Sequence, residues 1–216
     1  MSSENPGQDY PYTKWEAKFI ELAQQMNIQP DPESDQPFLL SVDGTSRQGT
    51  AVSGRVERGT LKPGDEIEIL GLRSARKTAC AAIENGATAI DEARAGDEVT
   101  VLLAEDDEAE KGQVLATPGT ITAHTEFRAQ IYLTKADEGG RRTPFFTNCH
   151  PQFHFHTTGF TGTATLPEGV KMAMPGEDVG VRVELSAPVA MEKGLRFLIH
   201  DGPDLVGVGV VAEIIA

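Results

Sequence analysis

The sequence predicts an all-β protein of two tandem antiparallel β-barrels, preceded by one short N-terminal helix. From residue 37 onward, apolar and polar residues alternate with a period of two in many short segments, as expected for strands with one buried face. The 216 residues include 22 Gly and 13 Pro, a turn-rich composition that favours short strands. A Pro-Gly-acid turn recurs at 63–65 and 175–177, where Pro fixes φ and Gly accepts a positive φ. This spacing of strands and turns fits barrels better than strand–helix–strand units.

Residues 1–36 are expected to form a tail, a helix and a linker. The first twelve residues are polar, contain two prolines and are predicted to be disordered. The segment KWEAKFIELAQQMN (14–27) predicts a helix whose apolar residues recur at helical spacing on one face: Trp15, Phe19, Leu22 and Met26. Such a stripe indicates a helix that docks on a core. The segment QPDPESDQ (29–36) reads as a linker.

The first barrel is predicted over residues 37–118 and the second over 119–216. Segments such as GTAVSGRVE, DEIEIL and VTVLL supply strands of the first barrel, and EFRAQIYL, VGVRVEL and LRFLIH supply strands of the second. The segment ATPGTITAH (116–124) lies near the middle of the chain and is rich in turn residues. It therefore marks the predicted junction between the barrels.

Composition limits the classes of partner. The chain has 33 acidic and 19 basic residues, a net charge of −14, so it repels phosphate at long range unless a local basic patch overrides the field. Two cysteines, Cys80 and Cys149, suggest a reducing compartment with buried thiols, and a disulfide between them is the alternative. The sequence has no run of 18 consecutive apolar residues and its N-terminus has no apolar signal core. We expect a cytoplasmic protein with no membrane partner.

The segment Thr134–Asp137 (TKAD) resembles the motif with which GTPases read guanine. A nucleoside triphosphate also needs a phosphate cradle, usually G-x-x-x-x-G-K-[ST] between a strand and a helix, and the sequence contains no such string. TKAD instead ends an apolar segment and enters a Gly-Gly loop. We interpret the match as an accident, so the sequence predicts no enzyme activity, no catalytic residue and no cofactor.

Three further groups of residues could suggest chemistry. His154 and His156 share one strand face near Cys149 and His150, but no additional ligand cluster supports a metal site, so a solvent-facing pair is expected. Asp106 and Asp107 could suggest paired carboxylates for acid–base chemistry, but they belong to the acidic run EDDEAE, which is typical of a solvated surface. Ser, His and Asp all occur, but without a G-x-S-x-G setting. No metal and no catalytic constellation is predicted.

Several long strings carry a family resemblance. DEGGRRTPFF, TGTATLPEGV and AMEKGLRFLIHDG resemble the third domain of bacterial elongation factor Tu, and GTAVSGRVERGTLKPGDEIEI and KGQVLATPGTI resemble its second domain. KWEAKFIELA is similar to the last helix of its GTPase domain, so the resemblance spans about residues 14–216. It implies two β-barrels and a truncated translation protein whose GTPase domain is missing apart from that helix. The implied partners are aminoacyl-tRNA, the ribosome or a translation factor, and a separately encoded GTPase domain.

The resemblance also implies RNA-binding residues, with departures from the family pattern. Glu84 matches a glutamate of the family's pocket for the terminal adenosine of tRNA, whereas Ala87 and Glu98 stand where the family has Arg and Asn. Arg141 and Arg142 form a basic pair in a Gly-rich loop, which either contacts tRNA or a partner, or is simply solvated. The RNA-binding candidates are therefore Glu84, Arg141 and Arg142.

Other departures predict weak RNA binding. In the family pattern R-P-Q-F-Y-F-R, both arginines are histidines here, His150 and His156, which are mostly neutral at pH 7. Asp204 and Glu213 replace basic residues of the family. We expect aminoacyl-tRNA to bind with a Kd above about 10 μM at physiological salt. The alternative is a barrel scaffold recruited to bind protein, in which tRNA recognition has decayed.

Overall fold

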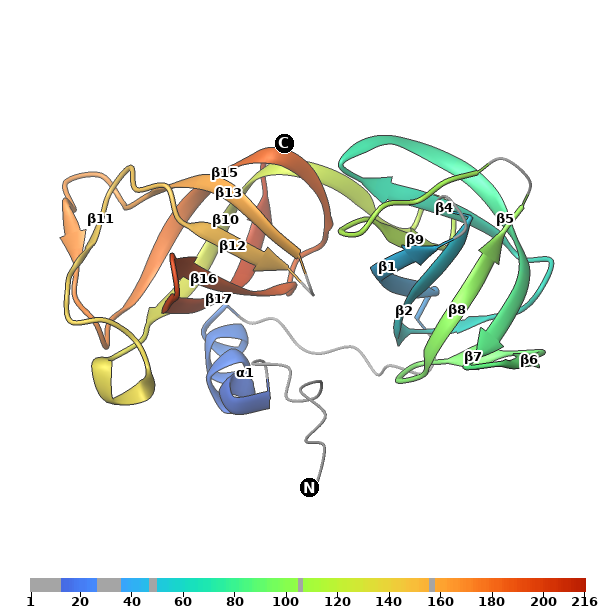
Figure 1. Ribbon diagram of the computed structural model, residues 1–216. Coiled ribbons are helices and arrows are strands. Elements are labelled where there is room, and N and C mark those ends of the chain that lie inside the picture. Colours follow the sequence, from blue (N-terminus) through green and yellow to red (C-terminus); the bar gives the residue numbers. More distant parts are fainter. Residues whose placement is uncertain (1–12, 27–35, 47–49, 105–106, 156–157) are drawn as a thin grey trace, which may run out of the picture.

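The computed structural model describes residues 13–26, 36–46, 50–104, 107–155 and 158–216. A short helical segment, η1 (Thr13–Trp15) and α1 (Glu16–Gln25), precedes two β-barrels that lie side by side (Figure 1). The prediction of two antiparallel barrels preceded by one helix is confirmed. The predicted tail, 1–12, and most of the predicted linker lie outside the described residues.

The first barrel is a closed antiparallel sheet in the order β4-β9-β1-β2-β8-β5, with β4 pairing to β5. Its strands are β1 (Leu39–Ser46), β2 (Ala51–Arg58), β4 (Glu66–Gly71), β5 (Arg73–Asn85), β8 (Glu98–Leu103) and β9 (Val114–Ala116). Three shorter strands lie outside this ring: β6 (Thr88–Ile90) extends the sheet beyond β5, while β3 (Thr60–Leu61) pairs with β7 (Ala93–Arg94).

The second barrel closes in the order β10-β15-β13-β12-β16-β17. Its strands are β10 (Thr122–Leu133), β12 (Gln152–Phe155), β13 (Thr158–Thr165), β15 (Asp178–Met191), β16 (Arg196–Asp201) and β17 (Asp204–Ile214). A short turn of helix, η3 (Ala136–Glu138), follows β10. The strands β11 (Phe145–Phe146) and β14 (Met172–Ala173) form a separate two-stranded ribbon.

The recurrent Pro-Gly-acid turns have a common structure. The central glycines have positive φ, 95° at Gly64 and 94° at Gly176, as the sequence predicts, and Gly96 of the variant turn Ala95-Gly96-Asp97 has the same φ of 94°. The acid that follows accepts a 2.8 Å hydrogen bond from the backbone N–H three residues before it: Lys62 to Asp65, Arg94 to Asp97 and Met174 to Glu177. The motif therefore both reverses the chain and satisfies a donor that the sheet leaves unpaired.

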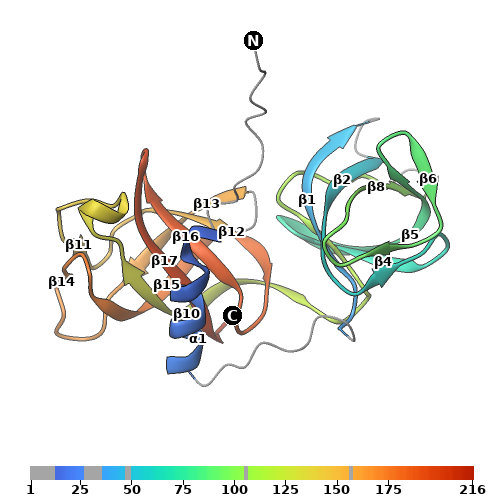
Figure 2. The same cartoon turned by 90° about the horizontal axis from the view of Figure 1, so that it is seen from below.

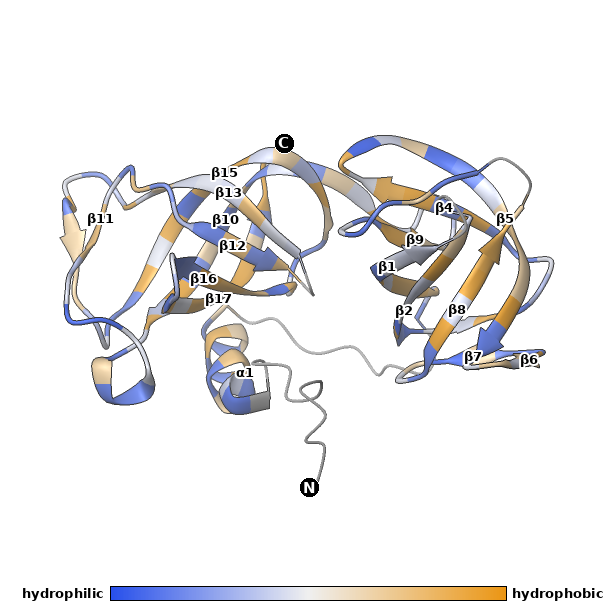
Figure 3. Ribbon diagram, in the orientation of Figure 1, coloured by the Kyte–Doolittle hydropathy of each residue, from blue (hydrophilic) through white to orange (hydrophobic). Residues whose placement is uncertain are grey.

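Alternation of residue type along the strands builds two separate cores (Figure 3). Along β8, Val99, Val101 and Leu103 point inward and are buried, while the residues between them are more exposed. Barrel one is filled largely by aliphatic side chains. Barrel two is filled by a cluster of phenylalanines: Phe127, Phe145, Phe153, Phe155, Phe160 and Phe197.

The helix α1 packs against barrel two, although the chain continues from α1 into barrel one (Figures 1 and 2). Phe19 and Leu22 are fully buried and Trp15 is 7% exposed. They cover an apolar area of the outer wall formed by Tyr132, Leu198, Val208 and Val210. The predicted docking of the helix stripe on a core is confirmed, and the surface that it covers belongs to the second barrel.

Polar contacts surround this apolar area. Glu16 pairs with Arg196 at 2.7 Å and Lys18 pairs with Asp178 at 2.9 Å. Lys14 donates a 2.7 Å hydrogen bond to the backbone carbonyl of Glu138. These contacts fix the position of α1 on the wall, because they reach three separate elements, β16, β15 and η3.

The two barrels contact one another through the tight turn between β4 and β5. Leu72, at this turn, has φ of 61°, donates its N–H to the carbonyl of Pro188 at 2.8 Å and packs against the core of barrel two. Arg58 at the end of β2 forms an ion pair with Glu192, which follows β15. Side-chain packing, a backbone hydrogen bond and an ion pair therefore hold the barrels together.

Candidate nucleic-acid interface

Glu84 lies near the end of β5, two residues before the turn at Gly86, where φ is 64°. Its Cα partners are Ala89 on β6 and Thr100 on β8, and its side chain is half-buried on the outer face. Glu98 is two residues before Thr100 and exposed, so it lies diagonally opposite Glu84 on the same face. This surface of barrel one therefore presents two neighbouring carboxylates.

Ala87 occupies the position where the family resemblance leads us to expect an arginine. Ala87 is exposed in the turn between β5 and β6, so a longer side chain there would reach the surface beside Glu84. Alanine offers no donor to a phosphate or a hydroxyl. Glu84 thus lies at the end of β5 beside this turn, and the neighbouring carboxylate of Glu98 disfavours the approach of a phosphodiester.

The structure separates the predicted basic pair. Arg141 has a side chain that is 18% exposed, and its guanidinium forms an ion pair with Asp201 at 2.5 Å and a long hydrogen bond to the Pro144 carbonyl. Arg142 is exposed and makes no ion pair within the described part of the chain. Of the two arginines, only Arg142 therefore presents an uncompensated positive charge, and its contact with RNA stays a prediction.

The candidates do not converge on one pocket. Glu84 belongs to barrel one beside β6, whereas the loop that carries Arg141 and Arg142 precedes β11 of barrel two. Figure 1 shows β6 and β11 at opposite ends of the molecule. A single small ligand cannot span both regions, so only an extended ligand such as a folded RNA would contact both.

Basic residues on the outer wall of barrel two are largely compensated. Arg128 on β10 pairs with Glu213 on β17 at 2.9 Å, and Arg182 on β15 pairs with Glu126 on β10. Glu213 is one of the acids that replace a basic residue of the family pattern. These pairs lower the positive potential that would attract a phosphate backbone.

The segment Thr134–Asp137 has a structural role that accounts for its residues. Thr134 is 1% exposed and its hydroxyl donates to the carbonyl of Leu205 at 2.6 Å. The Lys135 N–H donates to the Glu138 carboxylate at 2.8 Å, which caps η3. TKAD therefore ends a strand and begins a helical turn, as expected if its likeness to a guanine-reading motif is accidental.

Both cysteines carry free thiols, so the alternative of a disulfide is wrong. Cys80 is buried, as predicted, whereas Cys149 is only half-buried. Burial raises the pKa of each thiol to about 11. Neither thiol is therefore an activated nucleophile at neutral pH.

The predicted solvent-facing histidine pair requires a correction. His156 lies outside the described residues, and His154 is half-buried because its ring packs against that of His200 on β16. Asp106 is likewise outside the described residues. In the part of the chain that the structure covers, no three metal-ligating side chains cluster.

An exposed apolar ribbon is a surface that the sequence reasoning missed. Phe146 and Met172 are Cα partners on β11 and β14, and each is 53% exposed. Val170 and Met174 are also exposed and lie at alternate positions on either side of Met172. Alternation of apolar residues in VKMAM would predict a buried face, so the sequence pattern gives no signal that Val170, Met172 and Met174 are exposed.

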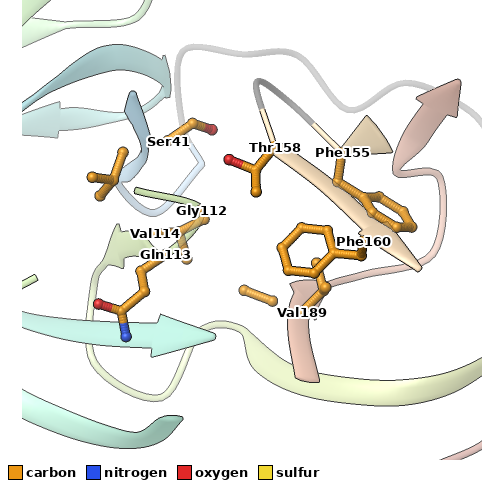
Figure 4. A pocket seen from close by; sticks show the side chains of 10 residues that line it. Ser41, Gly112, Gln113, Val114, Phe155, Thr158, Phe160 and Val189 are labelled. Carbon is orange, nitrogen blue, oxygen red and sulfur yellow. The ribbon is translucent and has the colours of Figure 1, made fainter. Parts of the chain in front are cut away.

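A small pocket lies between the barrels (Figure 4). Gly112 and Gln113 approach it from barrel one, and Thr158, Phe160 and Val189 from barrel two. Its interior, about 10 Å³, admits roughly one water molecule and no organic ligand. The pocket is a packing feature of the contact between the barrels.

None of the helices within the described residues is long and apolar enough to cross a membrane.

Comparison with family models agrees with this geometry. Residues 49–116 match the model of Elongation factor Tu domain 2, and residues 120–215 match that of the Elongation factor Tu C-terminal domain. The first match falls on the strands of barrel one from β2 to β9, and the second covers barrel two from near its first strand to its last. Each barrel is therefore similar to one domain of elongation factor Tu, and the two matches follow one another along the chain.

Proposed function

We propose that the two barrels are the aminoacyl-tRNA-binding half of an elongation factor Tu-like translation protein. The observation that carries the proposal is the match of both barrels, in order, to consecutive elongation factor Tu domains. Its partners are aminoacyl-tRNA, the ribosome or a translation factor, and a separately encoded GTPase domain. We place its activity in the cytoplasm.

The proposed RNA contact is weak because its charges are sparse. Arg142 is exposed, but Arg141 is engaged with Asp201 and Glu84 lies beside Glu98. The net charge of −14 opposes the approach of RNA most strongly at low salt, where screening is least. We expect a Kd above about 10 μM at physiological salt.

A titration with aminoacyl-tRNA at two salt concentrations tests this proposal. Arg142→Ala should weaken binding by about 1 kcal/mol or more, because it removes a charge-assisted contact. Arg128→Ala is the matched control, since it makes the same charge change on barrel two at a residue that is paired with Glu213. Equal losses of affinity in both variants would mean that only the net charge of the chain matters and that Arg142 makes no specific contact. Tight binding that persists at high salt would contradict the proposed weak affinity.

The proposal also predicts that the chain neither binds nor hydrolyses GTP. The sequence has no phosphate-cradling string, and TKAD is accounted for by the end of β10 and the cap of η3. Calorimetric titration with GTP and GDP in the presence of magnesium should show no binding, and Asp137→Ala should change nothing. Micromolar affinity for either nucleotide would contradict the proposal.

A second function is favoured by the exposed apolar ribbon β11–β14. Exposed Phe146 and Met172 are unusual on a monomer surface and are typical of protein contacts. In this alternative the barrels are a scaffold for a protein partner, and tRNA recognition has decayed. Failure to bind tRNA even at low salt, in a chain with an intact β circular dichroism spectrum, would favour it over the first function.

A further inference from the structure

The hairpin that joins β5 to β6 carries the dipeptide Asn85-Gly86, and the sequence contains no other Asn-Gly pair. Asn85 ends β5, Gly86 and Ala87 form the turn, and Thr88 begins β6 as the Cα partner of Asn85. Gly86 has φ of 64° at the first central position, as in a type II′ hairpin turn.

An asparagine that precedes glycine is chemically labile. The backbone nitrogen of the following residue attacks the carbon of the asparagine carboxamide and closes a cyclic imide, a succinimide. A side chain on the following residue hinders this attack, and glycine has none. The reaction at Asn85 therefore depends on whether the fold leaves the carboxamide and the Gly86 nitrogen free.

The fold leaves both groups free. Asn85 is exposed, and its carboxamide makes no hydrogen bond among the described residues. The Gly86 N–H likewise donates to no group in the described part of the chain. A Cβ placed at Gly86 would meet no atom within 4 Å, so water and base reach the turn without obstruction.

The attack also requires Asn85 to leave the extended conformation of β5, and the position of β6 makes this opening easy. β6 has three residues and lies at the outer end of barrel one, where it pairs with β5 and with no other described strand (Figure 1). Thr88 and Ala89 are exposed, and only Ile90 packs against the core. The hairpin therefore opens from its turn at far lower cost than global unfolding.

We propose that Asn85 is a site of spontaneous deamidation and that its main product, an isoaspartyl linkage, detaches β6 from β5. The Gly86 nitrogen loses its proton to a base and bonds to Cγ of Asn85. The bond from Cγ to the carboxamide nitrogen breaks, and that nitrogen leaves as ammonia with the proton. Water then adds to one carbonyl carbon of the succinimide and opens the ring, and no step depends on RNA binding.

The two ways of opening the ring give different main chains. Water attack at Cγ gives an ordinary aspartate at position 85. Attack at the α-carbonyl carbon gives isoaspartate, in which the main chain runs through the side-chain carbon and is longer by one methylene. Either product adds a carboxylate beside Glu84, on a surface that already carries Glu98.

The longer main chain of isoaspartate disrupts the pairing of β6. The two-residue turn sets the register in which Asn85 pairs with Thr88 and Glu84 with Ala89. A methylene inserted at the turn shifts one strand against the other, so these pairs are lost. The barrel itself stays closed, because β5 keeps its pairing with β4 and with β8.

Asn148 provides a control within the same chain. It is also exposed, but its Oδ1 accepts a 3.2 Å hydrogen bond from the Thr165 hydroxyl. The residue that follows it, Cys149, has a side chain and is half-buried. The carboxamide of Asn148 is therefore engaged and its neighbour is hindered, so we expect it to persist.

Mass spectrometry of peptides tests the modification. The full chain is incubated at pH 7.5 and at pH 9.0 for several days and digested at mildly acidic pH, which suppresses the reaction during handling. We expect the Asn85 peptide to deamidate, faster at pH 9.0 because the Gly86 nitrogen must lose a proton, while Asn148 stays intact. Labelling by an isoaspartyl methyltransferase should show that isoaspartate is the main product.

Two results would overturn the modification site. In the first, Asn85 deamidates no faster than Asn148. In the second, Asn85 keeps its amide in the folded chain but loses it in the chain unfolded in urea, so that the hairpin protects it. Asn85→Gln should remove the reaction at this position, because the longer side chain closes a larger ring far more slowly.

Hydrogen exchange tests the detachment of β6. In the isoaspartyl fraction of the incubated chain, the peptide that contains β6 should exchange faster than in the fresh chain, while β8 stays protected. Fresh Asn85→Asp is the matched control, since it adds the same charge without lengthening the main chain, and it should keep β6 protected. Unchanged exchange in the isoaspartyl fraction, or an equal loss of protection in Asn85→Asp, would overturn the proposed detachment.

Discussion

Both barrels are closed six-strand antiparallel sheets, but their strand orders differ and they fill their interiors with different side chains. Among the described core residues, the interior of barrel one contains a single aromatic ring, Phe38, amid aliphatic side chains. The interior of barrel two contains six phenylalanines. Phe197 lies at the centre of this cluster, with ring centroids of Phe127, Phe153 and Phe155 between 5.4 and 5.9 Å from its own.

Closing six antiparallel strands into a barrel therefore does not by itself fix which side chains fill the core. Aliphatic side chains in barrel one each contribute a similar share of buried area. The tilted and edge-to-face rings of barrel two add ring–ring interactions to the burial of a larger area. We therefore expect barrel two to depend on a few residues, and barrel one to depend on many.

The largest expected effect is the truncation of Phe197. Phe197→Ala should lower the free energy of unfolding by about 3–5 kcal/mol, because it removes a fully buried ring from three ring contacts. Ile69→Ala in barrel one should cost less, about 2–4 kcal/mol. Urea unfolding followed by circular dichroism measures both, and an equal or larger loss for Ile69→Ala would refute the contrast between the barrels.

A second contrast is that the described helix α1 covers barrel two. Ten residues are too few for an isolated helix in water, so α1 depends on its dock. Phe19→Ala should undock it, with strong acrylamide quenching of Trp15 and a loss of about 2 kcal/mol, since undocking limits the cost. Ile20→Ala is the control, because Ile20 is 43% exposed on the side of α1 that faces away from the barrel. Quenching of Trp15 in Ile20→Ala equal to that in Phe19→Ala would contradict the assignment of the docked face.

Much of this architecture is readable from the sequence. Alternation predicts the strands because each strand has one buried face, and Pro-Gly-acid turns predict their ends because glycine is needed at positive φ. The stripe of Trp15, Phe19 and Leu22 predicts a docked helix. Sequence order alone cannot reveal that α1 rests on barrel two, because that contact joins residues far apart in the chain.

The candidate site is predicted less well for the same reason. Arg141 and Arg142 are equivalent in the sequence, but Asp201, sixty residues further on, engages the first and leaves the second exposed. His154 was expected to face solvent because its partner, His200, lies on a strand that only the fold brings beside it. Local pattern identifies a residue's face, whereas long-range pairing decides whether its charge is available.

The contact between the barrels rests partly on Leu72, a bulky residue at φ of 61°. Leu72→Asn should cost about 1–2 kcal/mol, because asparagine tolerates this backbone conformation but forfeits the packing against barrel two. The unfolding transitions of the two barrels should also separate. Arg73→Ala is the control, because Arg73 is the exposed neighbour of Leu72 and pairs with Glu110, and it should keep a single unfolding transition. A single unfolding transition in Leu72→Asn as well would show that other contacts couple the barrels.

The smallest expected effect concerns Tyr132, beside α1. Its hydroxyl donates to the Glu138 carboxylate at 2.8 Å, and its ring lies under the Lys18 ammonium, 4.3 Å from the ring centroid. Tyr132→Phe keeps the ring and its contact with Trp15, so we expect a loss of only about 0.5–1.5 kcal/mol, the worth of one hydrogen bond. Urea unfolding at pH 7.5 measures it.

The pH dependence of this loss identifies its cause. Burial, and then the hydrogen bond to Glu138, raise the pKa of Tyr132 above the usual value of 10.0, so above pH 10 the folded chain keeps a proton that the unfolded chain releases. Stability then falls as pH rises, because the unfolded state binds fewer protons than the folded state. The difference between wild type and Tyr132→Phe should therefore be constant below about pH 9 and shrink above pH 10. A difference that is unchanged up to pH 11 would mean that neither burial nor Glu138 holds the phenol proton in the folded chain, and that the loss comes from altered packing under α1.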